Sequence, residues 1–251
     1  MSAFARLRSV FNRAIAPTGF SLARPHELAA ARQNHWTMEK ALARIACLGI
    51  RPASVIDLGA GRGEWSRLAY EVFPDADYAL VEPLAERAAE LATFCQKHPR
   101  MRHVPAAAGA AAGQTSFDVS ADLDGSGIYS AAAPNARRVV SVRTVDEIVQ
   151  ALGLQPPFLL KLDTHGYELP IFAGATRTLA DTTLLVVEVY NFQLSSTTVR
   201  FWELCAWLHE HGFLPADLAG LMDRPRDGLF WQTDLLFLRS EHPSFAVSSY
   251  A

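Results

Sequence analysis

The sequence predicts an α/β domain of the Rossmann-like class, with a mostly parallel sheet and helices on both of its faces. Residues 54–58 form a short apolar run around Asp57, and three glycines at every second position follow it before a helical pattern over 65–72. Residues 77–81 form a second apolar run that ends at Glu82, 25 positions after Asp57 (82 − 57). A strand, a glycine turn and a helix, with an acid after the next strand, are typical of folds that bind a nucleotide-like ligand.

Composition sets the class of protein. The chain has 251 residues, of which 50% are apolar and 20% are charged, so one large domain with additions is expected. The net charge of −3 argues against nucleic acid as the main partner. Three widely spaced cysteines predict neither a zinc site nor a disulfide framework. The sequence has no run of about eighteen uncharged apolar residues and no apolar block of the signal-peptide kind, so we expect no transmembrane segment and a cytoplasmic location.

Residues 1–50 are expected to form a helical extension or cap. Residues 3–16 place Phe4, Leu7 and Phe11 on one helical face, with arginines elsewhere around the helix. Such a helix can pack on its own domain or on a partner subunit, and the alternative is a peripheral contact with an anionic membrane surface. Residues 26–48 form a second helical stretch before the first strand.

The glycine turn indicates which ligand the domain binds. A dinucleotide fingerprint requires a third glycine at position 64, where the chain has Glu64. The acids Asp57 and Glu64 on either side of the turn would repel a phosphate and attract a cationic amino-acid group. S-adenosylmethionine fits that description, and an acid at the tip of the second strand would accept hydrogen bonds from its ribose. The expected cofactor-binding residues in this region are Asp57, Gly59, Ala60, Gly61 and Glu82.

The later elements follow in the order expected for an open sheet. Thr144 and Glu147 are in capping-box register and predict a helix start. A loop with turn chemistry over residues 122–129 is expected near the substrate. Strands are expected at 101–106, 115–119, 139–142, 158–163, 183–189, 212–217 and 234–239. Helices are expected at 84–97, 144–152 and 201–211, and a further helix is expected to follow residues 164–168 and run to residue 179.

Acidic residues stand at or near the ends of four predicted strands. Asp57, Glu82, Asp163 and Glu188 each lie at the carboxyl end of such a strand, where ligands gather in open α/β sheets. His165 follows two positions after Asp163, and an imidazole can act as a base near neutral pH. The sequence therefore predicts a polar site at this edge of the sheet.

At this point the residues resemble a known family. Residues 161–175 read K-L-D-T-H-G-Y-E-L-P-I-F-A-G-A, similar to the K-x-D-x-E/Q-G-x-E-x-x-x-L-x-G-A signature of the FkbM-type S-adenosylmethionine-dependent methyltransferases. Residues 142–148, 187–188 and 232–238 are also similar, so the resemblance spans about residues 53–239. It implies a class I methyltransferase fold with a seven-stranded, mostly parallel sheet whose last strand is antiparallel. Residues 51–242 would then form the methyltransferase domain and residues 243–251 a C-terminal tail.

The resemblance also implies an activity, namely O-methylation of a sugar, a glycan or a polyketide-type small molecule. His165 stands where the family commonly has Glu or Gln, and we expect it to be the catalytic base, with Asp163 as the second candidate base or as a cofactor-positioning residue. No metal is expected. The alternative is a Mg²⁺ site made by Asp163, Glu188 and Asn191 that orients two vicinal hydroxyls, as in catechol-type methyltransferases.

Two functions from other classes stay open. A dehydrogenase-like nucleotide enzyme is disfavoured by Glu64, and a non-catalytic adenosyl-ligand-binding protein is disfavoured by the four acids at the strand ends. The sequence leaves the identity of the acceptor and the oligomeric state open.

Overall fold

The computed structural model describes residues 35–121, 123–128, 136–195 and 198–249. One compact unit begins at Met38 and includes the strands and helices described below. The predicted helix over residues 3–16, and most of the predicted extension 1–50, lie outside the described residues. Among the helices that the structure describes, none has both the length and the apolar character needed to cross a membrane.

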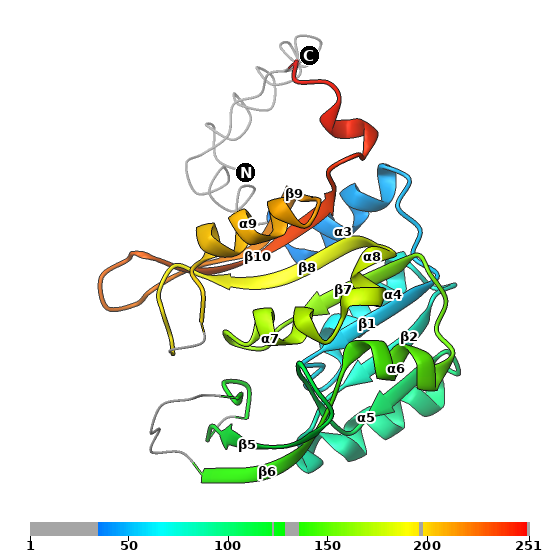
Figure 1. Cartoon of the computed structure of the whole chain (residues 1–251), viewed down its shortest axis with the longest axis vertical. Helices are drawn as coiled ribbons and strands as arrows, with labels where there is room; N and C mark the ends of the chain where they lie inside the picture. Colours follow the sequence, from blue (N-terminus) through cyan, green and yellow to red (C-terminus); the bar gives the residue numbers. More distant parts are fainter. Residues whose placement is uncertain (1–34, 122, 129–135, 196–197, 250–251) are drawn as a thin grey trace, which may run out of the picture. The chain divides into compact units, whose positions relative to one another are not determined.

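The centre of this unit is a mixed sheet to which seven of the described strands belong (Figure 1). The strand order is β3-β2-β1-β7-β8-β10-β9, and β10 runs antiparallel to both of its neighbours while the others are parallel. The predicted sheet with an antiparallel last strand is therefore confirmed. The strands are β1 (Ser54–Leu58), β2 (Asp77–Val81), β3 (Met101–Val104), β7 (Phe158–Leu162), β8 (Thr182–Tyr190), β9 (Phe213–Asp223) and β10 (Phe230–Arg239).

Helices pack on both faces of this sheet. Buried residues of α3 (Met38–Cys47), α4 (Glu64–Val72) and α5 (Ala85–Lys97) share one apolar cluster with Val55, Leu159 and Val186. The opposite face, which includes Ile56 and Leu160, forms a second cluster with the remaining helices. These are α6 (Val145–Leu152), α7 (Glu168–Ala173), α8 (Thr176–Ala180) and α9 (Phe201–Glu210), and a short 3-10 turn, η2 (Pro243–Phe245), follows β10.

A small second sheet lies between β3 and α6 in the chain. Among the residues described there, it has the order β4-β6-β5, with β4 (Ala107–Ala108), β5 (Gly113–Val119) and β6 (Ala136–Arg143). The two predicted extra strands at 115–119 and 139–142 thus pair antiparallel, as β5 and β6. Phe117 and Val119 form a small apolar cluster with Leu84 and with the segment that follows β5, where Leu123 and Ile128 pack partly buried.

The single helix predicted to follow residues 164–168 is instead two short helices, α7 and α8. They are separated by Gly174, where a Cβ atom would lie 2.1 Å from the carbonyl oxygen of Gly109. The backbone after α7 therefore packs directly on the backbone that follows β4. This contact joins residues that are far apart in the sequence, so the helical pattern does not reveal it. It lies where the first of the two helices ends.

The polarity of the α3/α4 face changes along the strands. Side chains alternate between the faces of a strand, so Asp57, Lys161 and Glu188 share the face of Val55, Leu159 and Val186. That face is apolar toward the amino ends of β1, β7 and β8 and polar toward their carboxyl ends. The helices therefore cover the apolar part of this face, and the polar groups lie together at the edge formed by the carboxyl ends of the strands.

The capping box predicted for α6 gives a test of stability. The Thr144 hydroxyl accepts a hydrogen bond from the Glu147 N–H at 3.1 Å, and the Glu147 carboxylate accepts one from the Thr144 N–H at 3.0 Å. We expect Thr144→Ala to lower the free energy of unfolding by about 1 kcal/mol, because the backbone N–H of Glu147 loses its hydroxyl acceptor. Urea denaturation measures this. The control is Thr93→Ala within α5, where the hydroxyl only bonds to Ala89 one turn earlier, and equal losses in both variants would contradict a capping role.

Candidate active site

A cavity of about 420 Å³ opens at the carboxyl ends of β1, β2 and β7. This volume is within the range of small-molecule pockets. Its wall includes most of the site residues that the sequence predicts, namely Gly59, Ala60, Gly61, Glu82, Asp163 and His165. Residues Leu123, Asp124 and Ser126–Ile128, which follow β5, line it as well.

The glycine turn after β1 packs backbone against backbone on β7. Gly59 has a φ of 73°, and a Cβ atom there would lie 2.1 Å from the carbonyl oxygen of Asp163. Only glycine tolerates both the left-handed conformation and this approach. The turn is therefore held against the residue that begins the polar segment after β7.

Glu82, which follows β2, holds the glycine turn in place. Its carboxylate accepts one hydrogen bond from the Gly61 N–H at 3.0 Å and one from the Leu84 N–H at 2.8 Å. Burial raises the pKa of Glu82, while these two N–H groups act in the opposite direction. Each carboxylate oxygen keeps a further lone pair for a ligand, and the side chain lines the cavity.

Asp57 does not reach the cavity wall. Its side chain is fully buried beneath the glycine turn, where one oxygen accepts a hydrogen bond from the Ser66 hydroxyl at 2.7 Å. The other oxygen lies 3.0 Å from the Lys161 ammonium. Burial raises the pKa of Asp57, and Lys161 and Ser66 oppose that effect. Asp57 is thus the partner of a buried lysine, and the contact of its carboxylate with a ligand stays a prediction.

Lys161 connects the glycine turn with Asp163, and no pattern in the sequence indicated this role. Its buried ammonium also donates to the Gly59 carbonyl at 3.0 Å and lies 3.4 Å from the Asp163 carboxylate. Burial acts to lower the pKa of Lys161, but the charges of Asp57 and Asp163 more than offset it, so the pKa is raised and the lysine stays charged. Burial acts to raise the pKa of Asp163, but the charges of Lys161 and His165 outweigh it and lower the pKa.

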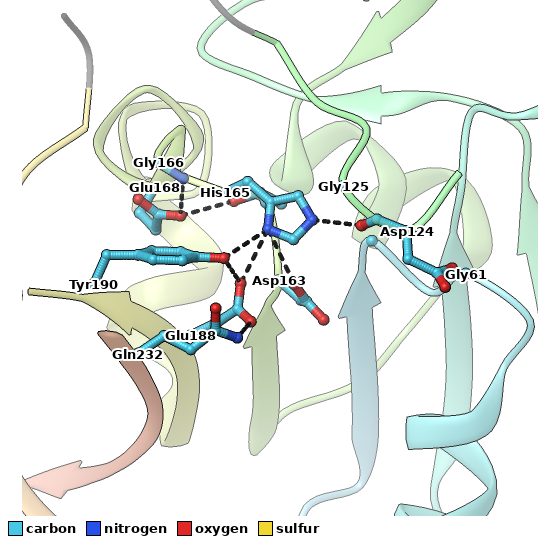
Figure 2. Close-up of polar contacts among 12 residues, drawn as sticks. Gly61, Asp124, Gly125, Asp163, His165, Gly166, Glu168, Glu188, Tyr190 and Gln232 are labelled. Atoms are coloured by element: carbon cyan, nitrogen blue, oxygen red, sulfur yellow. Dashed lines mark hydrogen bonds and ion pairs between the residues drawn. The ribbon is translucent and has the colours of Figure 1, made fainter. Parts of the chain in front are cut away.

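His165 lies at the centre of a second polar group (Figure 2). Its Nδ1 atom lies 3.0 Å from the Glu188 carboxylate, 2.8 Å from the Tyr190 hydroxyl and 3.8 Å from the Asp163 carboxylate. Its Nε2 atom lies 2.7 Å from the Asp124 carbonyl oxygen. The backbone at His165 is left-handed, with a φ of 53°, which few residues other than glycine adopt.

The charge balance of this group favours a protonated imidazole. Burial acts to lower the pKa of His165, but the Glu188 hydrogen bond and the charges of Asp163 and Glu188 raise it to about 9. Burial and the charge of Asp163 raise the pKa of Glu188. The two carboxylates repel each other, so a positive charge between them stabilises both.

Glu188 is held by two residues that were not predicted from the sequence, Tyr190 and Gln232. Its carboxylate accepts hydrogen bonds from the Tyr190 hydroxyl and from the Gln232 side-chain amide. Asn191, which belongs to the alternative magnesium site with Asp163 and Glu188, donates its side-chain amide to the Phe230 carbonyl at 3.0 Å. The period of two along a strand could have identified Tyr190, which is two positions after Glu188. Gln232 requires knowledge of how β10 pairs with β8.

Comparison with known proteins gives a family match. The model of the methyltransferase FkbM domain matches residues 57–215. A search of curated proteins found no match.

Several solved structures are similar to this chain. Methyltransferase FkbM from Methylobacillus flagellatus KT is 18% identical with a TM-score of 0.49, and the match covers 73% of this chain and 43% of that chain, less than half of its length. A 1,6-didemethyltoxoflavin-N1-methyltransferase from Burkholderia thailandensis, with S-adenosylhomocysteine bound, is 18% identical with a TM-score of 0.45 over 88% of this chain and 93% of that chain. Magnesium protoporphyrin IX methyltransferase from Synechocystis PCC 6803, with SAM bound, is 12% identical with a TM-score of 0.46 over 96% and 98%.

The buried lysine gives a second test of stability. We expect Lys161→Met to lower the free energy of unfolding by about 3–5 kcal/mol, because Asp57 loses the cation that compensates its burial. The pKa of Asp57 is already above its value of 3.8 in the unfolded chain and would rise further. A raised pKa contributes stability below the unfolded value and loses it as pH rises through the folded value. The deficit should therefore grow between about pH 5 and pH 8, measured by urea denaturation at both.

The control for this test is the exposed Lys97→Met in α5, which should change stability by less than about 0.5 kcal/mol. A deficit in Lys161→Met that does not change with pH would contradict the assignment of Asp57 as the uncompensated group.

Proposed function

Because the chain belongs to the FkbM methyltransferase family, we propose that it is an S-adenosylmethionine-dependent O-methyltransferase. The proposed acceptor is a hydroxyl group of a sugar, a glycan or a polyketide-type small molecule. The observation that carries the proposal is one cavity whose wall brings together the glycine turn, Glu82 and the pair Asp163 and His165. A ligand bound along the turn would have its reactive end beside this pair. A cytoplasmic location stays a prediction from the sequence.

The residues of the cavity fit the proposed cofactor. Glu82 is fixed by two backbone N–H groups, so its remaining lone pairs can accept hydrogen bonds from ribose hydroxyls. The glycine turn lets backbone approach the amino-acid part closely. Ala106, Ala107 and Ile128 line the same cavity and offer apolar surface for an adenine ring. Asp163, with its lowered pKa, provides a negative charge for a cationic ligand.

S-adenosylmethionine, when bound, supplies an electrophilic methyl group. The protein's contribution to such a transfer is first to hold the acceptor oxygen in line, which can supply much of the rate enhancement. The backbone contact between Gly59 and Asp163 supports this role, because it fixes the glycine turn relative to the polar segment after β7.

The second contribution is to accept the proton of the acceptor hydroxyl. His165 is the first candidate, since Glu188 orients the ring at Nδ1 and raises its basicity. To act, Nε2 must lose its proton and exchange the Asp124 carbonyl for the acceptor hydroxyl. Asp163 is the second candidate, and its lowered pKa makes it the weaker base.

The proposal is tested by methyl transfer from radiolabelled S-adenosylmethionine to a panel of sugars, glycans and polyketide-type hydroxyl compounds. Label recovered as a methyl ether on any of them supports the function. A non-catalytic adenosyl-ligand-binding protein would instead bind S-adenosylhomocysteine and transfer no label, and absence of binding would contradict both functions.

Glu82 gives a prediction about cofactor affinity. We expect Glu82→Ala to weaken binding of S-adenosylmethionine and S-adenosylhomocysteine by about 1.5–3 kcal/mol, or roughly 10- to 150-fold, through loss of hydrogen bonds to a charged group. Calorimetric titration measures both affinities. Glu71→Ala, which removes an exposed acid from α4, is the control and should bind like the unchanged chain. Unchanged affinity in a folded Glu82→Ala variant would refute the ribose assignment.

His165 gives a prediction about pH. Its pKa of about 9 means that the base form of the imidazole is scarce at neutral pH. The parameter to measure is kcat/KM for the acceptor found above, because it reports the pKa values of the free enzyme. With a chelator present, it should rise about tenfold for each unit of increasing pH and level off near pH 9. His165→Asn, whose new side chain tolerates a left-handed backbone, should lose this rising limb. A flat profile for the unchanged chain would rule out His165 as the base.

A further inference from the structure

We propose that Asp163, His165 and Glu188 together bind one divalent cation of the Mn²⁺ or Fe²⁺ class. The proposal deepens the proposed function, because Asp163 and His165 line the cavity where the acceptor hydroxyl would lie. Its test needs no acceptor, so it can fail while the proposed function stands.

The three residues offer ligand atoms at suitable distances. One carboxylate oxygen of each acid and the Nδ1 atom of His165 all lie within 4.8 Å of one another. Nδ1 lies 3.0 Å from Glu188 Oε2 and 3.8 Å from Asp163 Oδ1. Metal–ligand bonds of about 2.0–2.2 Å separate neighbouring ligand atoms by about 3–4 Å. A cation can therefore be accommodated with small movements of the side chains.

A second, independent observation comes from Asp163. Its Oδ1 atom is buried and has no hydrogen-bond partner among the residues that the structure describes. The distance of 3.8 Å to His165 Nδ1 is too long for a hydrogen bond. A buried carboxylate oxygen without a partner is costly, and a cation shared with His165 and Glu188 would satisfy it.

The orientation of the imidazole also fits a metal ligand. Nε2 lies 2.7 Å from the carbonyl oxygen of Asp124, which can only accept a hydrogen bond, so Nε2 carries a hydrogen. In the neutral ring this leaves the lone pair on Nδ1, which faces both carboxylates (Figure 2). Histidines that bind metals commonly donate their other N–H to a backbone carbonyl or a carboxylate, which fixes the ring for ligation.

Outer hydrogen bonds hold the other two ligands in the same way. Lys161 lies 3.4 Å from the second oxygen of Asp163, so Oδ1 stays directed at His165. The Gln232 amide donates to Glu188 Oε1 and the Tyr190 hydroxyl donates to Oε2. Partners of this kind raise metal affinity by about 10- to 100-fold in known sites.

The donor set indicates the kind of cation. Two carboxylate oxygens suit Mg²⁺ and Mn²⁺, whereas an imidazole nitrogen suits transition metals such as Fe²⁺, so the mixed donor set fits a transition metal that also accepts carboxylates. A bound cation would polarise the acceptor hydroxyl as a Lewis acid. In that form Nδ1 carries no proton and His165 is a ligand rather than a base, so the pH dependence predicted above applies to protein kept in chelator.

The test is a titration of the chelator-treated full chain with Mn²⁺, followed by the electron paramagnetic resonance signal of free Mn²⁺. We expect one Mn²⁺ per chain and at least tenfold weaker binding of Mg²⁺ in competition. Glu188→Gln and His165→Asn should each lose at least about tenfold in affinity. Pulsed resonance of the bound Mn²⁺ should show coupling to an imidazole nitrogen that His165→Asn abolishes. Asp234→Asn, which removes an acid paired with Glu188 across β8 and β10, is the matched control for charge and should keep affinity within about threefold.

Several results would overturn the proposal. One is absence of Mn²⁺ binding by a chain that still binds S-adenosylhomocysteine. A second is binding of Mg²⁺ that is tighter than that of Mn²⁺. A third is a loss of Mn²⁺ affinity in Asp234→Asn that equals the loss in Glu188→Gln. A fourth is Mn²⁺ affinity that is unchanged in both Glu188→Gln and His165→Asn. Binding of S-adenosylhomocysteine shows that a variant is folded. If Glu188→Gln or His165→Asn does not bind it, Asp163→Asn is tested in place of that variant. Failure to bind S-adenosylhomocysteine by the unchanged chain would count against the proposed function instead.

Discussion

The ammonium group of Lys161 is the contact on which the arrangement of the site depends. It bonds to Asp57 on β1, to the carbonyl of Gly59 in the glycine turn and to Asp163 after β7, and it is almost completely buried. A buried charge is destabilising when it loses a partner. Asp57, Gly59 and Asp163 therefore cannot move independently of one another. Because Gly59 and Asp163 both line the cavity, the buried lysine sets the position of the glycine turn relative to the groups proposed to act on the acceptor.

The sheet explains why these charges can gather in the interior. On β1, β7 and β8 the face beneath α3 and α4 is apolar at its amino end, where Val55, Leu159 and Val186 pack against helices. At the carboxyl end the same face presents acids, and the basic groups Lys161 and His165 lie among them. Apolar packing supplies the free energy of folding, and the polar edge relies on paired charges. The amino ends of these strands therefore provide apolar packing, and their carboxyl ends carry the polar groups of the candidate site.

The sequence predicted the sheet, the glycine turn and the acids at the strand ends, because these follow from short-range patterns. It did not predict the ion pair of Asp57 with Lys161, because that contact depends on how β1 pairs with β7. Nor did it predict the contact of Asn191 with Phe230 or that of Gln232 with Glu188, because both depend on where β10 pairs with β8. The contact of Asp124 with His165 joins segments 41 residues apart through a loop. Patterns in sequence place residues on strands, whereas pairing and loop contacts decide which side chains meet.

The contact of Gly59 with the carbonyl of Asp163 has a consequence for how such a protein can change over evolution. Since no side chain lies between the two backbones, no substitution there can lengthen or shorten their separation without disrupting the turn. The separation of the glycine turn from Asp163 is therefore a fixed property of the fold. For the proposed methyl transfer, a change of acceptor would then have to come from segments around this contact, such as residues 123–128 after β5, rather than from the turn itself.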